Sequence, residues 1–398
     1  MGNRDDASDG SLRGRAARWA QAVERRIDAL LAPSRRRRGD AVVRPYLGYG
    51  CGTRVRVRAR VLRDTAPGPA MPGDGWISNL RAAWRRFASA EIAGAVVAIE
   101  VVASARDGRP LVAEVVARAD PEGFLDELVT LPAAAASGWA TVRYRLEDPA
   151  PVAGRPDTFH GRALVPAGDA PYGVISDMDD TVLVTDATRL ARMLRRTLLQ
   201  NVHERLPFTG VAQLYRAFAD VGAPLFYVSS SPWNLYVPLS RFLNLNGVPE
   251  GPLMLRDWGL EADAPSGRGH AGHKLAEIDA ILDACPGLRF VLIGDSGQED
   301  PEIYARLLEA RPGRVAGVLI RHVAGPERAR EVDALAREVR DAGVPFARVD
   351  DSAQAARIAV EAGWIDEAAR ASVEAASDLD ASDLNASGPD ATGPDATG

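Results

Sequence analysis

Hydrophobic and polar residues alternate strictly in the segment TRVRVRARVL, residues 53–62. Because successive side chains of a β-strand point to opposite faces, this pattern predicts a strand with one buried apolar face and a row of arginines on the other. We expect the arginine row to be a solvated face, with contact to an anionic ligand as the alternative. Short strands with turn residues between them predict an antiparallel, sandwich-like domain over residues 41–165. The other β-like segments are 93–102, 110–119, 139–147 and 158–165.

A different pattern begins near residue 171, where short, wholly apolar runs alternate with segments of helical periodicity. Strand–helix repetition with apolar strands predicts a parallel sheet covered by helices on both faces, which we place at residues 166–365. Ligands of such sheets bind at the carboxyl ends of the strands, so polar residues at those ends are candidate site residues. The apolar runs are 172–176, 224–229, 289–294, 315–320 and 345–349.

The two ends of the chain carry opposite charge. Residues 1–40 contain ten arginines against six acids, and apolar residues recur at helical spacing between Trp19 and Leu31. This pattern predicts a basic amphipathic helix, which either packs on the body of the protein or lies peripherally on an anionic membrane surface. Residues 366–398 contain eight acids against one arginine and end in GPDATGPDATG, which predicts a disordered acidic tail.

Composition narrows the class of protein only slightly. The 398 residues include 48 basic and 54 acidic side chains, for a net charge of −6, which does not suggest a nucleic-acid partner. No segment approaches the roughly 18 uncharged apolar residues of a membrane span. The N-terminal segment lacks the apolar region of a secretory signal, and the two cysteines form no metal-binding pattern. We therefore expect a cytoplasmic location, with peripheral membrane contact left open by the N-terminal helix.

Acidic residues follow two of the apolar runs. The first run ends in DMDDT and the third in GDSGQED. Carboxylates packed at a strand end repel one another unless a cation or a shared proton compensates, and an oxygen-rich acidic cluster suits Mg²⁺. The candidate residues are Asp177, Asp179 and Thr181 after the first run, and Asp295 and Asp300 after the third.

Hydroxyl groups and a lysine complete the candidate set. Ser229 and Ser230 lie where the second run ends in SSSPWN, and hydroxyls with free N–H groups at a helix start can bind an anion. Lys274 is the only lysine beside 47 arginines and precedes the third run. A helix start and a surface charge explain each feature separately. Chance is a weaker explanation for the combination. The acids, hydroxyls and lysine occur in a fixed order, and the hydroxyls and both acid clusters lie at strand ends.

The motif order DxDxT, an apolar strand ending in Ser, Lys, and then GDxxxxD resembles the haloacid dehalogenase superfamily of phosphohydrolases. More closely, ISDMDDT, YVSSSPWN, HK and LIGDSGQEDPEIY resemble the catalytic domain of actin-patch-type phosphatidate phosphatases and their bacterial relatives. The resemblance covers about residues 170–365, and RPYLGYG at 44–50 extends it more weakly. It implies a Rossmann-like parallel sheet of the haloacid dehalogenase type.

The resemblance also implies roles for the acids. Asp177 would be the nucleophile that forms an aspartyl-phosphate. Asp179 would protonate the leaving oxygen and then deprotonate the attacking water. Mg²⁺ would be held by Asp177, the backbone carbonyl of Asp179, and Asp295, with Asp300 steadying the metal or its waters.

The remaining matched residues would act on the phosphoryl group. Ser229 and Ser230 would bind phosphoryl oxygens, and Lys274 would neutralise charge as the transition state forms. Thr181 would support the loop.

The expected function is therefore that of a Mg²⁺-dependent phosphatase, with phosphatidate as the substrate that the resemblance implies. Two alternatives stay open: a phosphatase of a soluble phosphate ester, and a non-catalytic lipid-binding protein with a phosphatase fold. Retention of both acid clusters and the lysine weighs against the second. A two-component receiver domain uses similar residues, but its lysine comes last, whereas acids follow Lys274 here.

Overall fold

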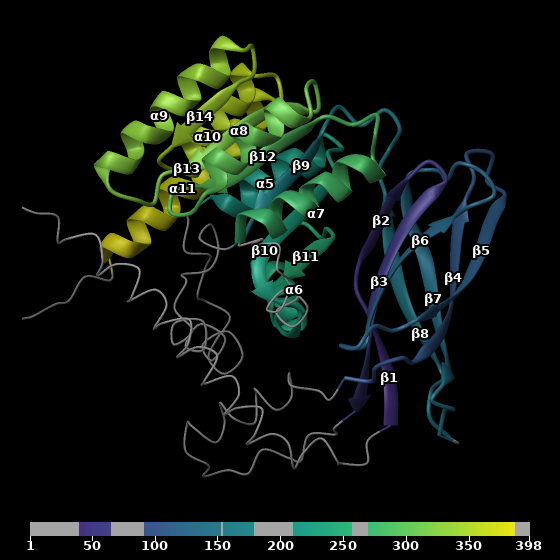
Figure 1. Ribbon diagram of the computed structural model, residues 1–398. Helices are drawn as coiled ribbons and strands as arrows, with labels where there is room; N and C mark the ends of the chain where they lie inside the picture. Colours follow the sequence, from purple (N-terminus) through teal and green to yellow (C-terminus); the bar gives the residue numbers. More distant parts are fainter. Residues whose placement is uncertain (1–39, 65–90, 153, 179–209, 257–269, 387–398) are drawn as a thin grey trace, which may run out of the picture.

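The computed structural model describes residues 40–64, 91–152, 154–178, 210–256 and 270–386, which form a β-rich body followed by an α/β body (Figure 1). The basic amphipathic helix predicted near the N-terminus lies outside these residues, as do the candidate site residues Asp179 and Thr181. In the described part, no helix combines the length and the apolar character that crossing a membrane requires.

The first body is one hydrogen-bonded sheet in the order β1-β3-β2-β8-β7-β4-β5, with β6 paired to β3. Hydrogen bonds connect all eight described strands of this body, and the sandwich architecture stays a prediction. Most neighbours are antiparallel, whereas β2 and β8 run parallel. The strands are β1 (Asp40–Pro45), β2 (Gly48–Cys51), β3 (Arg54–Asp64), β4 (Val96–Ser104), β5 (Pro110–Arg118), β6 (Phe124–Thr130), β7 (Gly138–Asp148) and β8 (Thr158–Val165).

Alternation along β3 separates its two faces as the sequence predicts. Val57 and Ala59 are fully buried in the core of the β-rich body. The opposite face differs from the prediction, because Arg58 is only 3% exposed and Arg60 only 6%. The prediction of a solvated arginine row is wrong for these two residues. The α/β body packs on this end of β3 and supplies polar partners to both guanidiniums.

The second body contains a six-stranded sheet in the order β11-β10-β9-β12-β13-β14, with every described pair parallel. The parallel sheet predicted from the apolar runs is therefore confirmed, although its haloacid dehalogenase type stays a prediction. The short strand β11 was not predicted. The strands are β9 (Gly173–Asp177), β10 (Leu225–Pro232), β11 (Leu253–Arg256), β12 (Phe290–Asp295), β13 (Val315–Arg321) and β14 (Phe346–Val349).

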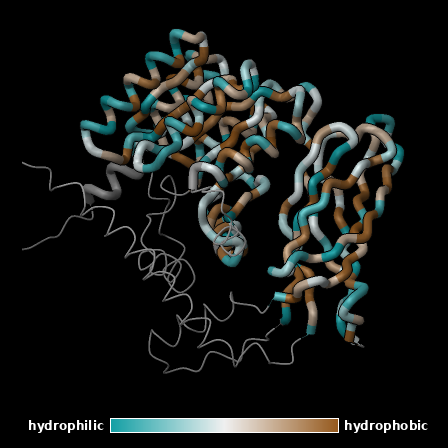
Figure 2. The backbone as a smooth tube through the Cα atoms, in the orientation of Figure 1, coloured by the Kyte–Doolittle hydropathy of each residue, from teal (hydrophilic) through white to brown (hydrophobic). Residues whose placement is uncertain are grey.

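Helices cover both faces of the parallel sheet. Neighbouring residues of β9 show the division: Val174 belongs to a hydrophobic cluster with residues of α5, α6 and α10, and Ile175 to a second cluster with residues of α7, α8 and α9. Hydrophobic segments accordingly run through the interior of both bodies (Figure 2). The helices are α5 (Val211–Asp220), the 3₁₀ helix η2 (Trp233–Leu235), α6 (Tyr236–Leu245), α7 (His270–Ala284), α8 (Asp300–Ala310), α9 (Pro326–Asp341), α10 (Ser352–Glu361) and α11 (Glu367–Ala386).

Helix α11 corrects the prediction of a disordered tail from residue 366. The helix packs against α5 and α10, and its Val373 is completely buried. Arg370 pairs with Glu367 and Glu374, which lie three and four residues away on the same face of the helix. The acidic composition of this segment therefore led to a wrong prediction of disorder for residues that form the packed helix α11. Residues 387–398 of the predicted tail lie outside the described residues.

Aromatic side chains join the two bodies. Tyr46, which follows β1, stacks on Trp233 of η2 with ring centroids 4.5 Å apart. The backbone N–H of Leu47 donates a hydrogen bond of 2.9 Å to the hydroxyl of Tyr236 in α6. Tyr49 of β2 meets Phe226 of β10 edge to face. The segment RPYLGYG is thus part of the contact between the β-rich body and the α/β body.

Candidate active site

The chain order of the parallel strands creates a switch point. From β9 the chain moves outward through β10 and β11, and then returns to place β12 on the other side of β9. The connections on either side of such a point diverge, which leaves a crevice at the carboxyl ends of the two central strands. Asp177 is the last residue of β9, and Asp295 is the last residue of β12. Topology alone therefore brings these two carboxylates together.

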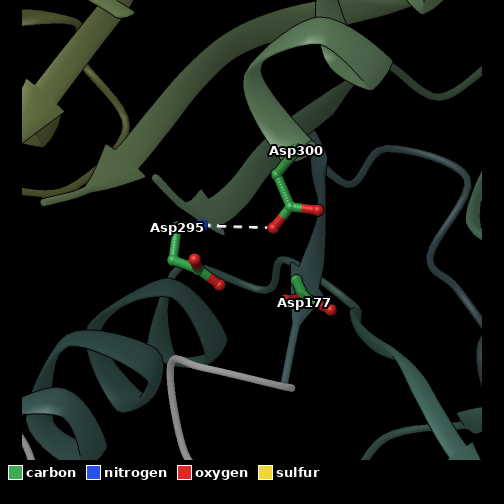
Figure 3. A group of neighbouring side chains, drawn as sticks. All are labelled: Asp177, Asp295 and Asp300. Atoms are coloured by element: carbon green, nitrogen blue, oxygen red, sulfur yellow. Dashed lines mark hydrogen bonds between the residues drawn. The ribbon is translucent and has the colours of Figure 1, made fainter. Parts of the chain in front are cut away.

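Asp300 joins them as the first residue of α8 (Figure 3). One potential ligand oxygen from each of Asp177, Asp295 and Asp300 lies within 4.8 Å of the others. Their exposed fractions are 1%, 0% and 0%. Carboxylates this close and this buried repel one another strongly unless positive charge is nearby. The cluster is a candidate cation site.

Lys274 of α7 extends its ammonium group into this cluster. Its Nζ lies 2.9 Å from Oδ1 of Asp177 and 2.7 Å from Oδ1 of Asp300, and it also donates to the side-chain oxygen of Gln298 at 3.2 Å. Lys274 is 2% exposed. Its single charge offsets one of the three carboxylates, so the donor set suits a divalent cation that prefers oxygen ligands, such as Mg²⁺. Asp177, Asp295 and Asp300 would supply the ligand oxygens.

The turn after β12 holds the two acids in place. Oδ1 of Asp295 accepts hydrogen bonds from the backbone N–H groups of Gly297 at 2.6 Å and Gln298 at 3.2 Å. The N–H of Asp295 donates to Oδ2 of Asp300 at 3.1 Å. A Cβ on Gly294 would lie 2.6 Å from that same oxygen and 2.8 Å from Cβ of Asp300, so only glycine allows this approach.

Arg328 of α9 secures the same turn from outside. Its Nε and Nη2 donate to the carbonyl oxygens of Ser296 and Gln298 at 3.1 and 3.0 Å. Glu302 holds the guanidinium with two hydrogen bonds of 2.6 and 2.8 Å, and this pairing raises the pKa of Arg328. Sequence reasoning missed Arg328, because it belongs to no motif and lies 28 residues beyond Asp300.

Ser176 and Tyr215 form a second contact that the sequence did not reveal. The hydroxyl oxygens of Ser176, beside Asp177 in β9, and Tyr215 of α5 lie 2.6 Å apart. Burial raises the pKa of Tyr215 to about 12. Tyr215 is therefore a neutral hydroxyl at ordinary pH, and it fixes the strand residue that precedes Asp177.

The predicted phosphate-binding serines end β10, the strand beside β9. Val228 is in register with Asp177, so Ser229 and Ser230 follow at the carboxyl edge of the sheet. Ser229 is completely buried and its hydroxyl accepts a hydrogen bond of 3.0 Å from the N–H of Ser231. The structure thus brings Asp177, Lys274, Asp295 and Asp300 into contact and places both serines at the same edge. Asp179 and Thr181 lie outside the described residues.

Buried carboxylates paired with a lysine at the switch point of a parallel α/β sheet define a class of protein: an α/β domain with a charged centre suited to phosphoryl chemistry. Comparison with known proteins is more specific. Residues 172–322 match the family model described as phosphatidate phosphatase APP1, catalytic domain. This segment contains every described residue of the centre, and the predicted enzyme class, a phosphoric monoester hydrolase, agrees with the match.

Two curated relatives support the same region. Phosphatidate phosphatase APP1 of Saccharomyces cerevisiae is 30% identical over 166 residues, which are 42% of this chain and 28% of the relative. An uncharacterized protein of Schizosaccharomyces pombe is 30% identical over 154 residues, 38% of this chain and 25% of that protein. The chain thus matches about a quarter of the length of each relative.

The similarity to solved structures is weak over the whole chain. The crystal structure of a glycosyl hydrolase family 2 member from Bacteroides cellulosilyticus has a TM-score of 0.28 at 10% identity, covering 82% of this chain and 44% of that chain. The structure of PhoD has a TM-score of 0.29 at 9% identity, with coverage of 70% and 61%.

Proposed function

We propose that this protein is a Mg²⁺-dependent phosphatidate phosphatase that works through an aspartyl-phosphate on Asp177. The observation that carries the proposal is the buried centre of Asp177, Lys274, Asp295 and Asp300, which lies inside the segment matching the phosphatidate phosphatase model. The name of the yeast relative supports the choice of phosphatidate over other phosphomonoesters.

In the proposed reaction, a carboxylate oxygen of Asp177 attacks phosphorus, and the bond from phosphorus to the lipid oxygen breaks. Asp179 gives its proton to the departing oxygen, which leaves as diacylglycerol. A water molecule, deprotonated by Asp179, then attacks phosphorus and releases phosphate from Asp177. Lys274 supports the first step in two ways. Its ammonium, 2.9 Å from Asp177, would stabilise the ionised carboxylate, and it would also compensate the negative charge that develops on the phosphoryl oxygens.

The metal would be held by Asp177, Asp295 and Asp300, with the backbone carbonyl of Asp179 as a further ligand that leaves its carboxyl group for proton transfer. Mg²⁺ would supply positive charge that compensates the clustered carboxylates and the phosphoryl oxygens of the substrate. Ser229 and Ser230 would bind those oxygens at the neighbouring strand end. Thr181 would support the loop between Asp177 and α5.

The test measures phosphate release from phosphatidate vesicles and from a panel of soluble phosphate esters, with and without Mg²⁺. The expected result is Mg²⁺-dependent release from phosphatidate that Asp177→Asn reduces by at least about 10⁴-fold, because the nucleophile is lost. Asp283→Asn is the matched control, since Asp283 lies on the exposed face of α7, where it pairs with Arg311. Release from a soluble ester alone would identify the alternative substrate class. Full activity of Asp177→Asn would overturn the mechanism.

A further inference from the structure

The arginines on one face of β3 differ in burial. Arg54 is exposed and Arg56 is partly buried, whereas Arg58 and Arg60 are buried where the α/β body packs on the strand. Burying a guanidinium costs free energy unless it is paired and hydrogen-bonded. The partners of Arg58 and Arg60 therefore identify which elements of the α/β body this face of β3 holds in place.

Arg58 reaches the helix that carries the candidate catalytic lysine. Its Nη1 and Nη2 donate to the two carboxylate oxygens of Glu277 in α7 at 3.0 and 3.1 Å, and its Nε donates to Asp126 of β6 at 3.1 Å. The carboxylates outweigh the effect of burial, so that the pKa of Arg58 is raised. Glu277 lies three residues after Lys274, about one helical turn away. In Figure 1, β2 and β3 lie beside α7, and both strands contact it.

Arg60 reaches the segment that follows Ser229 and Ser230, the candidate phosphate-binding serines. Its Nη1 donates to the side-chain oxygen of Asn234 in η2 at 2.9 Å. Its other donors bind the carbonyl of Glu122 and the carboxylate of Glu91, both in the β-rich body. The Arg58 guanidinium also lies 5.8 Å from the ring centre of Trp233, next to Asn234. Neighbouring arginines on one strand face thus hold two separate parts of the candidate site.

The contact with Glu277 restrains α7 in a direction that core packing does not. Ile278, Ile281 and Leu282 hold the helix against the sheet through their apolar side chains. Apolar contacts resist separation but are less effective against sliding or rotation, whereas a two-pronged guanidinium–carboxylate pair fixes both distance and direction. Lys274 needs this precision, because its Nζ must lie 2.9 Å from Asp177 and 2.7 Å from Asp300.

We propose that Arg58 is a positioning residue of the phosphatase centre, which fixes Lys274 through Glu277 and α7 and makes the β-rich body a working part of the active site. Arg60 does the same for the serine-bearing segment through Asn234. This inference rests on the proposed function, and it predicts an effect on turnover more than on substrate affinity.

The test is a double-mutant cycle on Arg58→Met and Glu277→Gln, assayed on phosphatidate vesicles and on p-nitrophenyl phosphate with Mg²⁺. Arg58→Met is expected to lower kcat by about 10²-fold with KM nearly unchanged, because a small displacement of a catalytic group has effects of that size. Adding Glu277→Gln should cause little further loss, since both changes remove the same contact. Additive losses would show that Arg58 does not act through Glu277 and would overturn the inference.

Two control variants separate this role from general stabilisation. Arg56→Met removes a neighbouring arginine that pairs with Asp126 inside the β-rich body. Arg162→Met removes an exposed pair with Glu250 that also joins the two bodies. Both should keep kcat within about twofold of the wild type, because neither Asp126 nor Glu250 belongs to a helix or strand that carries a candidate catalytic residue. An equal loss in either control would overturn a specific role for Arg58.

Two further measurements keep the inference testable. If Arg58→Met does not fold, Arg58→Lys retains the charge but not the two-pronged geometry, and should lose about tenfold in kcat. Amide hydrogen exchange over α7 should be faster in the Arg58 variants than in Arg162→Met, and unchanged exchange would overturn the inference. That measurement requires no substrate. An inactive wild type would therefore count against the proposed function alone, while normal activity of Arg58→Met beside an inactive Asp177→Asn would count against the inference alone.

Discussion

Buried charges occupy two regions of this protein, and their partners differ. On β3, Arg58 is matched by carboxylates of Asp126 and Glu277, within hydrogen-bond distance of each. At the carboxyl edge of the parallel sheet, three carboxylates cluster, and two of them, Asp177 and Asp300, pair with the ammonium of Lys274. A guanidinium paired with carboxylates fixes the relative position of the elements that carry them. Clustered carboxylates, in contrast, repel one another and are stabilised by a bound cation, alone or together with an anionic substrate. We therefore interpret the network around Arg58 as a support that positions the site, and the acidic centre as the place of the reaction.

Among the residues around Asp177, the largest effect is expected from removing the ammonium group of Lys274. Lys274→Met should lower phosphate release by at least about 10³-fold, because stabilisation of developing charge is lost. It should also reduce the free energy of unfolding by about 3–5 kcal/mol in the absence of metal, since buried carboxylates lose their partner. Phosphate release and thermal unfolding with and without Mg²⁺ would check both effects.

Lys274→Arg refines this prediction. The guanidinium keeps the charge but is planar and larger, so it cannot occupy the same position between Asp177 and Asp300. Stability should recover substantially, while activity should not. Full activity of Lys274→Arg would show that the only lysine in the sequence is an accident of composition.

A smaller effect is expected from Arg328, which positions the turn next to the centre. Arg328→Met should lower kcat by about 10- to 100-fold, because the turn that orients Asp295 and Asp300 loses two hydrogen bonds. Arg348→Met is the matched control, since Arg348 pairs with Asp333 and Asp350. An equal loss of activity in both variants would show that Arg328 acts only through the stability of the fold. Thermal unfolding of both variants would measure that contribution separately.

The sequence predicted the reactive centre better than its supports, and the reason is geometric. Asp177 and Asp295 end apolar runs, and parallel strands place their carboxyl ends along one edge, so local pattern suffices to bring them together. Arg328 and Tyr215 come from helices whose orientation depends on the packed core. No local signal marks either residue as a neighbour of the centre.

Arg58 shows the same limit within the β-rich body. Alternation along β3 correctly assigned Val57 to the core and Arg58 to the other face. It contained no information on what would cover that other face. The covering element, α7, lies more than 200 residues further along the chain, and only the folded structure brings Glu277 to Arg58. A similar limit applies to α11, where the acidic composition hid a buried Val373.

Gly294 offers a test of how closely the acids must approach. Gly294→Ala places a Cβ 2.6 Å from Oδ2 of Asp300, so Asp300 must shift, at a cost of about 1–3 kcal/mol in stability. Mg²⁺ should then stabilise the variant less than the wild type in thermal unfolding. Gly287→Ala is the control, because nothing lies within 4 Å of the added Cβ. Equal Mg²⁺ stabilisation in both variants would contradict a metal role for Asp300.

The smallest expected effect concerns Tyr215, which is buried beside the acidic centre but uncharged. Burial raises the pKa of Tyr215 to about 12 from 10.0, so the folded protein holds the neutral phenol more tightly than the unfolded chain does. Its contribution to stability is complete below pH 10 and is lost as the pH rises from 10 toward 12. Tyr215→Phe should therefore flatten the alkaline decline in stability over that interval. At neutral pH it should cost about 1 kcal/mol, because the hydrogen bond with Ser176 is removed. Urea unfolding at pH 7 and pH 11 measures both quantities, and an unchanged alkaline decline would show that another group causes it.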